Sequence, residues 1–310
     1  MEEVSTSLPH REGQRESLTI VKVGGAVVED EAQLAQLLKD FTAIKGAKIL
    51  VHGGGRRATK VAAELGIETK MVNGRRITDA AMLEVVTMVY GGLVNKHVVA
   101  LLQAQGVDAI GLTGADADIL RSTKRPPLVV DGSPLVVDGS PLAVDGSPLA
   151  VDGSPLAVDG SPLAVDGSPV DFGYVGDVKK ADGAKIAHFI GAGLVPVIAP
   201  LTHDGQGNIL NTNADTMASE TAKAMAALYD VTLIYAFEKP GVMRNPDDDS
   251  SLIPVITRPD FERYKADGTI SGGMLPKIEN ALAAVEAGVG RVIITLATAI
   301  DGQHGTVITE

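Results

Sequence analysis

The 310-residue sequence contains no cysteine and no tryptophan, and only 3% of its residues are aromatic. Without cysteine the chain forms neither disulfides nor thiolate metal sites, which fits a cytoplasmic protein. The shortage of aromatic side chains argues against platforms that stack nucleic-acid bases. The net charge is −12 at pH 7, from 39 acidic and 27 basic side chains. Such a charge argues against nucleic acid as a general partner, so we expect a soluble protein with an acidic surface.

Long hydrophobic runs are also missing. The sequence contains no stretch of 18 or more consecutive apolar residues, which is the pattern of a membrane-spanning helix. We therefore expect no membrane partner. The first 17 residues are polar and lack the apolar centre of a signal peptide. We expect residues 1–17 to form a disordered tail. The hydrophobic fraction of 45% is sufficient for a large core.

Short apolar segments alternate with helical patterns along most of the chain. Residues 18–23 and 47–51 predict strands, and leucines at helical spacing over residues 29–44 predict a helix between them. A long helical pattern covers residues 79–106, with an interruption expected at Gly91-Gly92. Alternating strands and helices favour parallel strands with crossover helices. The predicted fold class is therefore α/β, a three-layer sandwich with an open, mostly parallel sheet and helices on both faces.

One segment breaks this alternation. From Leu128 to Pro169 a seven-residue unit occurs six times, as LVVDGSP twice and then LAVDGSP four times. Pro and Gly in every unit exclude a helical coiled coil. The flanks would join two plausible strands through a short turn, so we place an insertion at a hairpin tip, where extra length costs little. A flexible surface loop is the preferred interpretation, and a small stacked β-array and a cation-binding arm are the alternatives.

Glycines follow two of the predicted strands. VKVGG places Lys22 on the first strand with Gly24 and Gly25 after it, and HGGG places Gly53 and Gly54 after the second. Ligands of open α/β sheets bind beyond the carboxyl ends of the strands, where bare N–H groups attract anions. Neither loop has the dinucleotide fingerprint or the P-loop pattern, and simple tight turns are the alternative. Two such loops at one sheet edge suggest a reaction between two anions.

Two later stretches add polar groups at predicted helix starts. NTNAD brings Asn211, Asn213 and Asp215 together, and a helix cap would explain only one of the three. GGMLPK places Lys277 in a first helical turn, where a cation is unfavourable unless an anion such as phosphate is near. A solvated lysine is the alternative for Lys277.

The ordered motifs KVGG, VHGGG, VNGRRIT, LNTNAD and GGMLPK resemble the amino-acid kinase family, from Leu18 to the C-terminus outside the repeats. The resemblance implies phosphoryl transfer from ATP, bound with Mg²⁺, to the side-chain carboxylate of an N-acylated glutamate in arginine biosynthesis. We expect N-acetyl-L-glutamate as the acceptor. The alternatives are N-succinyl-L-glutamate, the substrate of another amino-acid or carbamate kinase, and a non-catalytic sensor of the same fold.

The resemblance also implies the domain organisation and the assembly. Residues 18–310 would form a single domain, interrupted by the repeats. Its N-terminal lobe, residues 18–200, would bind the acyl-glutamate, and its C-terminal lobe, residues 201–310, would bind ATP. The family's members are at least dimers, so we expect a homodimer that pairs through the N-terminal lobe.

Individual roles follow from the same resemblance. Lys22 and Lys277 would flank the transferred phosphoryl group, and Asp215 would hold both lysines in position. The substrate-binding positions would be Gly53, Gly54, Arg76, Asn211 and Asn213, with the arginine clamping a carboxylate. The nucleotide-binding positions would be Gly24, Gly25, Gly241 and Gly273. We expect no metal site built from the protein's own side chains.

Overall fold

The computed structural model describes residues 15–72, 75–129, 136–137, 140–141, 169–245, 247–271 and 274–310. Most of the predicted tail, residues 1–14, lies outside this part of the chain, as do most of the repeats. The folded domain begins slightly earlier than predicted, because Ser17 starts the first strand and the Asp230 N–H donates to the Glu16 carbonyl.

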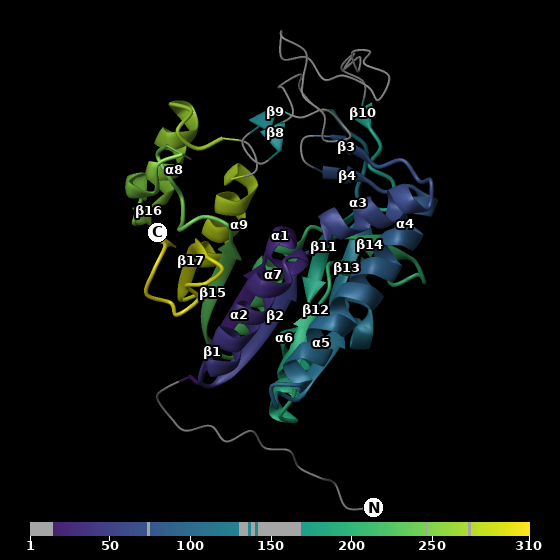
Figure 1. Ribbon diagram of the computed structural model, residues 1–310, viewed down its shortest axis with the longest axis horizontal. Coiled ribbons are helices and arrows are strands. Elements are labelled where there is room, and N and C mark those ends of the chain that lie inside the picture. The colour runs from purple at the N-terminus through teal and green to yellow at the C-terminus, as the bar shows by residue number, and fades with distance from the viewer. Residues whose placement is uncertain are drawn as a thin grey trace, which may run out of the picture.

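An eight-stranded sheet runs through the centre of the molecule, in the order β16-β18-β17-β15-β1-β2-β12-β5 (Figure 1). All neighbouring strands are parallel except β17 and β18. The predicted open, mostly parallel sheet is therefore confirmed. Its strands are β1 (Ser17–Val23), β2 (Ala47–His52), β5 (Ala109–Leu112), β12 (Val195–Ile198), β15 (Asp230–Phe237), β16 (Val255–Ile256), β17 (Arg291–Leu296) and β18 (Thr306–Ile308).

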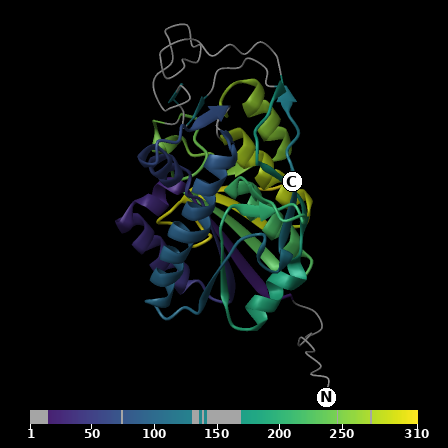
Figure 2. The same ribbon diagram turned by 90° about the vertical axis from the view of Figure 1, so that its right-hand side faces the viewer.

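Helices cover both faces of this sheet, as the two views show (Figures 1 and 2). One face packs against α1 (Gly25–Glu29), α2 (Glu31–Ala43), α3 (Gly55–Glu64), α4 (Ala80–Val86) and α5 (Asn95–Gln103). The other face packs against α6 (Gly183–Gly191), α7 (Ala214–Ala226), α8 (Arg258–Ala266) and α9 (Met274–Glu286). Two hydrophobic cores result, one on each side of the sheet.

The side chains of β1 alternate between the two cores. Leu18 and Ile20 belong to the core under α6–α9, whereas Val21 and Val23 belong to the core under α1–α5. Because successive side chains of a strand point to opposite faces, Lys22 lies on the α7 and α9 side. The strand register thus decides which helices can supply partners to this lysine.

One long helix differs from the prediction. A π-helical segment, Thr87–Val94, joins α4 to α5, so the helix continues through Gly91 and Gly92 instead of breaking there. The combined helix, Ala80–Gln103, is long and apolar enough to cross a membrane by length and composition alone. Its apolar residues are interrupted by polar ones, so it contains no uninterrupted apolar run of 18 residues. Its buried residues pack into the core under α1–α5, which is the behaviour of a core helix.

A smaller sheet and several hairpins flank the large sheet. Residues 201–310 were expected to form the C-terminal lobe, and β13, at the start of this range, pairs with β6, which lies within residues 18–200. The hairpin β6–β11 continues into β7 and β10, which pair antiparallel. β7 contains the first two residues of the repeats and β10 contains the last one, Pro169, which agrees with an insertion at a hairpin tip. The strands are β6 (Leu120–Lys124), β7 (Leu128–Val129), β10 (Pro169–Val170), β11 (Gly176–Ala181), β13 (Leu201–His203) and β14 (Ile209–Asn211), with the pairs β3 (Lys70–Val72) and β4 (Arg75–Ile77), and β8 (Val136–Val137) and β9 (Ser140–Pro141).

Candidate active site

Two lysines and one aspartate meet near the carboxyl end of β1. Lys22 Nζ lies 2.7 Å from Asp215 Oδ1, and Lys277 Nζ lies 3.1 Å from Asp215 Oδ2. The three side chains come from β1, α7 and α9, and all three are at most 16% exposed. The structure thus brings together the three residues predicted to be catalytic, with one carboxylate shared by two ammonium groups.

The charges of this group are strongly coupled. Burial alone would raise the pKa of Asp215, but the charges of Lys22 and Lys277 outweigh it and hold that pKa well below its usual range. Burial lowers the pKa of Lys22; the carboxylate of Asp215 opposes this shift and Lys277 adds to it. With all three groups ionised the cluster carries one excess positive charge. Such a cluster suits an anion that lies between the two ammonium groups.

The start of α7 explains how Asp215 is placed. Asn213 is the N-cap, and its Oδ1 accepts hydrogen bonds from the N–H groups of Asp215 (2.8 Å) and Thr216 (3.1 Å). Asn211 is buried, and its Nδ2 donates to Thr78 Oγ1 at 2.9 Å. The three polar residues of NTNAD therefore have different roles within the protein. Asn213 caps α7, Asp215 forms ion pairs, and Asn211 forms a buried hydrogen bond. The substrate contacts assigned to the two asparagines stay predictions.

The two glycine loops lie against each other beyond the ends of β1 and β2, which lead into α1 and α3 (Figure 1). A Cβ atom at Gly53 would lie 3.1 Å from the Gly25 nitrogen. A Cβ atom at Gly25 would lie 3.6 Å from the nitrogens of Gly54 and Gly55. The predicted neighbouring loops are therefore in close contact, and a side chain at Gly53 would force them apart.

Arg76, in β4, sits beside the second glycine loop. Its Nη2 donates to the Gly55 carbonyl at 2.9 Å and to Thr59 Oγ1 at 2.8 Å, and its Nη1 donates to Thr69 Oγ1 at 3.2 Å. The residue is buried, and within the described part of the chain no carboxylate forms an ion pair with it. A buried guanidinium held only by neutral groups is suited to an anionic ligand.

The remaining predicted nucleotide positions differ in their surroundings. The Gly24 N–H donates to the Ala236 carbonyl at 3.1 Å, which ties the first glycine loop to the end of β15. At Gly241 a Cβ atom would lie 2.7 Å from Thr306 Oγ1, so close packing already accounts for this glycine. Gly273 lies outside the described residues. The nucleotide contacts of all three stay predictions.

Two aromatic residues of β15, which no sequence motif indicated, complete the lysine cluster. Lys277 Nζ lies 5.7 Å from the centroid of the Tyr235 ring and 5.6 Å from that of Phe237. Tyr235 Oη also donates to the Asp215 backbone carbonyl at 3.2 Å. A cation within about 6 Å of a ring centroid is attracted to the ring face. Both positions face the same side of the sheet as Lys22, which is the signal that could have pointed to them.

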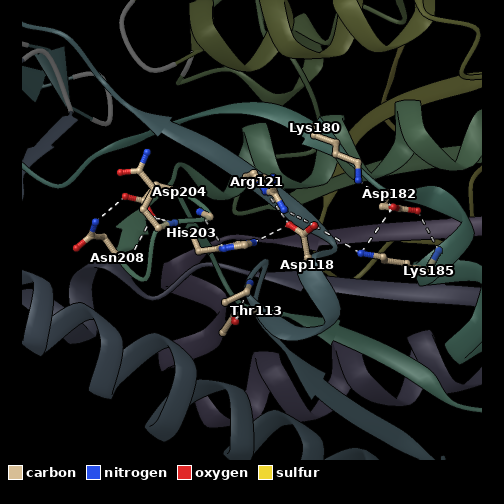
Figure 3. Close-up of polar contacts among 12 residues, drawn as sticks. Thr113, Asp118, Arg121, Lys180, Asp182, Lys185, His203, Asp204 and Asn208 are labelled. Carbon is tan, nitrogen blue, oxygen red and sulfur yellow. Dashed lines mark hydrogen bonds and ion pairs between the residues drawn. The ribbon is translucent and has the colours of Figure 1, made fainter.

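A second ionic cluster lies on elements that do not carry the lysine centre (Figure 3). Asp118 pairs with Arg121 (2.7 Å), with His203 Nε2 (2.8 Å) and with Lys185 Nζ (3.5 Å). Hydrogen bonding from Arg121 is the main cause that lowers the pKa of Asp118 to about 2. The cluster links the short 3-10 helix at Asp118 to β6, β13 and α6, so we interpret it as structural.

A crevice of about 650 Å³ lies elsewhere, between the end of α2 and the loop 298–303. It borders the amino-terminal halves of β1 and β15, opposite to the ends that carry the lysine cluster. None of the predicted site residues lines it.

The fold and the lysine cluster define an α/β protein with a buried, positively charged cluster near the carboxyl ends of parallel strands. The chain belongs to the Amino acid kinase family, whose sequence profile matches residues 17–296. It is 57% identical over 296 residues to the acetylglutamate kinase of Bacteroides thetaiotaomicron, which covers 96% of this chain and 100% of the relative.

Two further comparisons agree with this membership. The acetylglutamate kinase of Bacteroides fragilis is 54% identical over 300 residues, covering 97% of this chain and 100% of the relative. Among solved structures, smu.665 from Streptococcus mutans superposes with a TM-score of 0.67 at 26% identity, covering 94% of this chain and 98% of that one.

Proposed function

We propose that this protein transfers the γ-phosphoryl group of ATP to the side-chain carboxylate of N-acetyl-L-glutamate, a step of arginine biosynthesis. The observation that carries the proposal is the shared carboxylate of Asp215, which holds the ammonium groups of Lys22 and Lys277 beside the two glycine loops. The relatives' names support the choice of acceptor. ATP and a biosynthetic acceptor also favour the cytoplasm.

The chemistry needs charge neutralisation more than acid–base catalysis. An acceptor carboxylate is already ionised at neutral pH, because its ordinary pKa is about 4.3. One of its oxygens attacks the γ-phosphorus, the new O–P bond forms, and the bond from the γ-phosphorus to the bridging oxygen breaks as ADP leaves. Lys22 and Lys277 stabilise the charge on the transferred group, while Asp215 keeps both ammonium groups in position.

Mg²⁺ belongs to the nucleotide substrate in this proposal, because it is usually held by one or two carboxylates together with substrate phosphates. In the residues that the structure describes, no three His, Cys, Asp or Glu side chains come together. Gly24 and Gly25 would approach the ATP phosphates. Gly53, Gly54 and Arg76 would contact the acyl-glutamate.

A homodimer is the proposed assembly. Met88 and Leu93, on the long helix of the N-terminal lobe, are large hydrophobic side chains with exposed fractions of 54% and 49%. Apolar surface of this kind is covered in many dimers. Light scattering after gel filtration gives the mass directly, and a hexamer or a monomer would contradict the dimer.

Trapping of the product tests the proposed reaction. Hydroxylamine converts an acyl phosphate to a hydroxamate, so purified protein is assayed with ATP, Mg²⁺ and either N-acetyl- or N-succinyl-L-glutamate. We expect the higher kcat/KM with the acetyl compound. A higher value with the succinyl compound would replace the acceptor but keep the reaction class. Turnover with carbamate or free glutamate alone would reject the proposal.

A further inference from the structure

His52, the last residue of β2, has no part in the proposed transfer, yet it lies directly before the glycine loop. Its side chain is fully buried and points to the α1–α5 face of the sheet, opposite to the face of Lys22. A buried imidazole needs partners for both ring nitrogens. The identity of those partners indicates what the histidine does.

The hydrogen bonds fix one tautomer of His52. Nδ1 lies 2.7 Å from the Gly53 carbonyl oxygen, which can only accept, so Nδ1 carries the proton. Nε2 lies 3.1 Å from Asn95 Nδ2 and accepts from it. The ring is therefore neutral and donates its one N–H to the peptide that begins the glycine loop.

Asn95, the first residue of α5, is held in turn by its neighbour Lys96 and by two other elements. Its Nδ2 also donates to the Val197 carbonyl at 2.9 Å, and its Oδ1 accepts from Lys96 Nζ at 3.2 Å. Lys96 Nζ also donates to the Gly111 carbonyl at 3.1 Å, and a Cβ atom at Gly111 would lie 1.9 Å from Asn95 Oδ1. The amide orientation of Asn95, and with it the ring of His52, is thus set by β5, β12 and the adjacent Lys96.

The Gly53–Gly54 peptide is the group that this network orients. The Gly53 N–H donates to the Val23 carbonyl at 3.1 Å, and the Gly53 carbonyl accepts from His52. In a trans peptide the carbonyl and the following N–H point in opposite directions. The Gly54 N–H therefore points away from His52, and it has no acceptor among the described residues. Tyr90 closes the other side, since a Cβ atom at Gly54 would lie 2.9 Å from its ring.

We propose that His52 is a positioning residue for the acceptor site: its Nδ1–H holds the Gly53–Gly54 peptide so that the Gly54 N–H is presented to the acyl-glutamate. This inference rests on the proposed function for the identity of the ligand. It does not rest on that function for the orientation of the peptide. His52 touches neither reactant and acts through Gly53.

Two substitutions separate the role of Nδ1 from the loss of the ring. In His52→Asn the side-chain amide can take the position of Nδ1 and donate to Gly53. In His52→Gln the amide reaches the region of Nε2 and the donor to Gly53 is lost. Both variants remove the imidazole from the same buried place, so each controls for the packing defect of the other.

Steady-state kinetics give the first readout. We expect His52→Gln to raise the KM for N-acetyl-L-glutamate about 10–100-fold, by analogy with the loss found when a residue that orients a metal ligand is removed. The KM for ATP stays within about twofold, and His52→Asn stays within about threefold for both substrates. Equal effects of the two variants on the acceptor KM would overturn the proposal.

Crystal structures of the two variants without ligand give a readout that needs no activity. We expect the Gly53–Gly54 peptide to be reoriented in His52→Gln and retained in His52→Asn. The same peptide orientation in both variants would overturn the inference. Absence of turnover in the unsubstituted protein would reject the proposed function instead, and the structures would still decide the role of His52.

Discussion

At the scale of single residues, the site depends on a charge imbalance. Lys22 and Lys277 share the carboxylate of Asp215, and in the described part of the chain they have no second anionic partner. The protein keeps this excess charge largely out of water, where a neighbouring anion interacts with it more strongly. The ionised phosphates of a nucleotide are suited to supply the missing negative charge.

Removal of Lys22 tests that imbalance. Lys22→Ala is expected to lower kcat by at least about 100-fold, the size of effect seen when one preorganised charge-stabilising group is deleted. Circular dichroism should show an intact fold. The matched control is Lys48→Ala on the neighbouring strand, because Lys48 Nζ donates to the carbonyls of Thr42 (2.8 Å) and Ile44 (2.7 Å) at the end of α2. That variant should lose stability and keep its kcat, and a normal kcat in Lys22→Ala would refute the site assignment.

The buried imidazole of His52 predicts a dependence of stability on pH. Burial lowers its pKa to about 4, whereas the unfolded chain has the ordinary value of about 6.5. Between these values the unfolded state binds a proton that the folded state does not bind, so the free energy of unfolding falls as the pH falls from about 6.5 to about 4. The full loss is about 3 kcal/mol.

Urea unfolding at pH 7.5 and at pH 4.5 measures this loss. His52→Gln lacks the titrating group, so it should lose clearly less stability than the unsubstituted protein over the same interval. Parallel losses in the two proteins would show that His52 does not contribute.

The sequence indicated only some of the site residues. Lys22, Asp215 and Lys277 were predicted from ordered motifs, and the structure brings them together. His52 escaped notice because its partner Asn95 is 43 positions away along the chain. Aromatic residues at a strand end, as at Tyr235 and Phe237, look like ordinary core until the position of α9 is known. A sequence motif describes the spacing of residues within one helix or strand, whereas these contacts join side chains from different helices and strands.

At the scale of elements, the long helix beside the second glycine loop is the main departure from expectation. A glycine pair inside a helical pattern indicates a break, but here the backbone forms a π-helical segment instead. π-Helical turns occur mostly within longer helices and often near functional sites. Tyr90, in this segment, packs against the position of Gly54. Apolar periodicity does not reveal such a change of pitch, because it arises from tertiary packing.

The two glycines of this segment should respond differently to alanine. At Gly92 a Cβ atom would meet nothing within 4 Å, whereas at Gly91 it would lie 3.3 Å from Leu201 Cδ1. Gly92→Ala is expected to raise the free energy of unfolding by about 0.5–1 kcal/mol, because alanine loses less backbone entropy in a helix. Gly91→Ala should be less stable than Gly92→Ala. Denaturant titration compares the two, and the reverse order would contradict the described packing.

At the scale of the whole molecule, the layers place the candidate site. Parallel strands bring the ends of β1 and β2 to one edge, while α7 and α9 bring Asp215 and Lys277 to the same place from the opposite end of the chain. This architecture was predictable from alternating strands and helices. The assignment of β13 and β14 to the small sheet was not, because β13 pairs with β6, which is distant in sequence.

Deletion of the repeated segment tests whether the stability of the domain depends on the length of the hairpin connection. Deletion of residues 128–169 shortens a connection whose closure entropy changes slowly with length, so the melting temperature should not fall. The hairpin β6–β11 is formed outside the deleted residues and should persist. A variant that replaces the segment with a Gly-Ser linker of equal length separates its length from its sequence. Loss of turnover in the deletion alone would show that the length of this connection matters.

The most direct test of the central claim measures two products of one reaction. Protein, ATP, Mg²⁺ and N-acetyl-L-glutamate are incubated with hydroxylamine, and the ADP and the hydroxamate are quantified together. Transfer to the acceptor carboxylate predicts equal amounts of both, and neither product without the acceptor. ADP released without hydroxamate, or no ADP at all, would contradict the assignment of the Lys22–Asp215–Lys277 cluster as a centre for phosphoryl transfer to this acceptor.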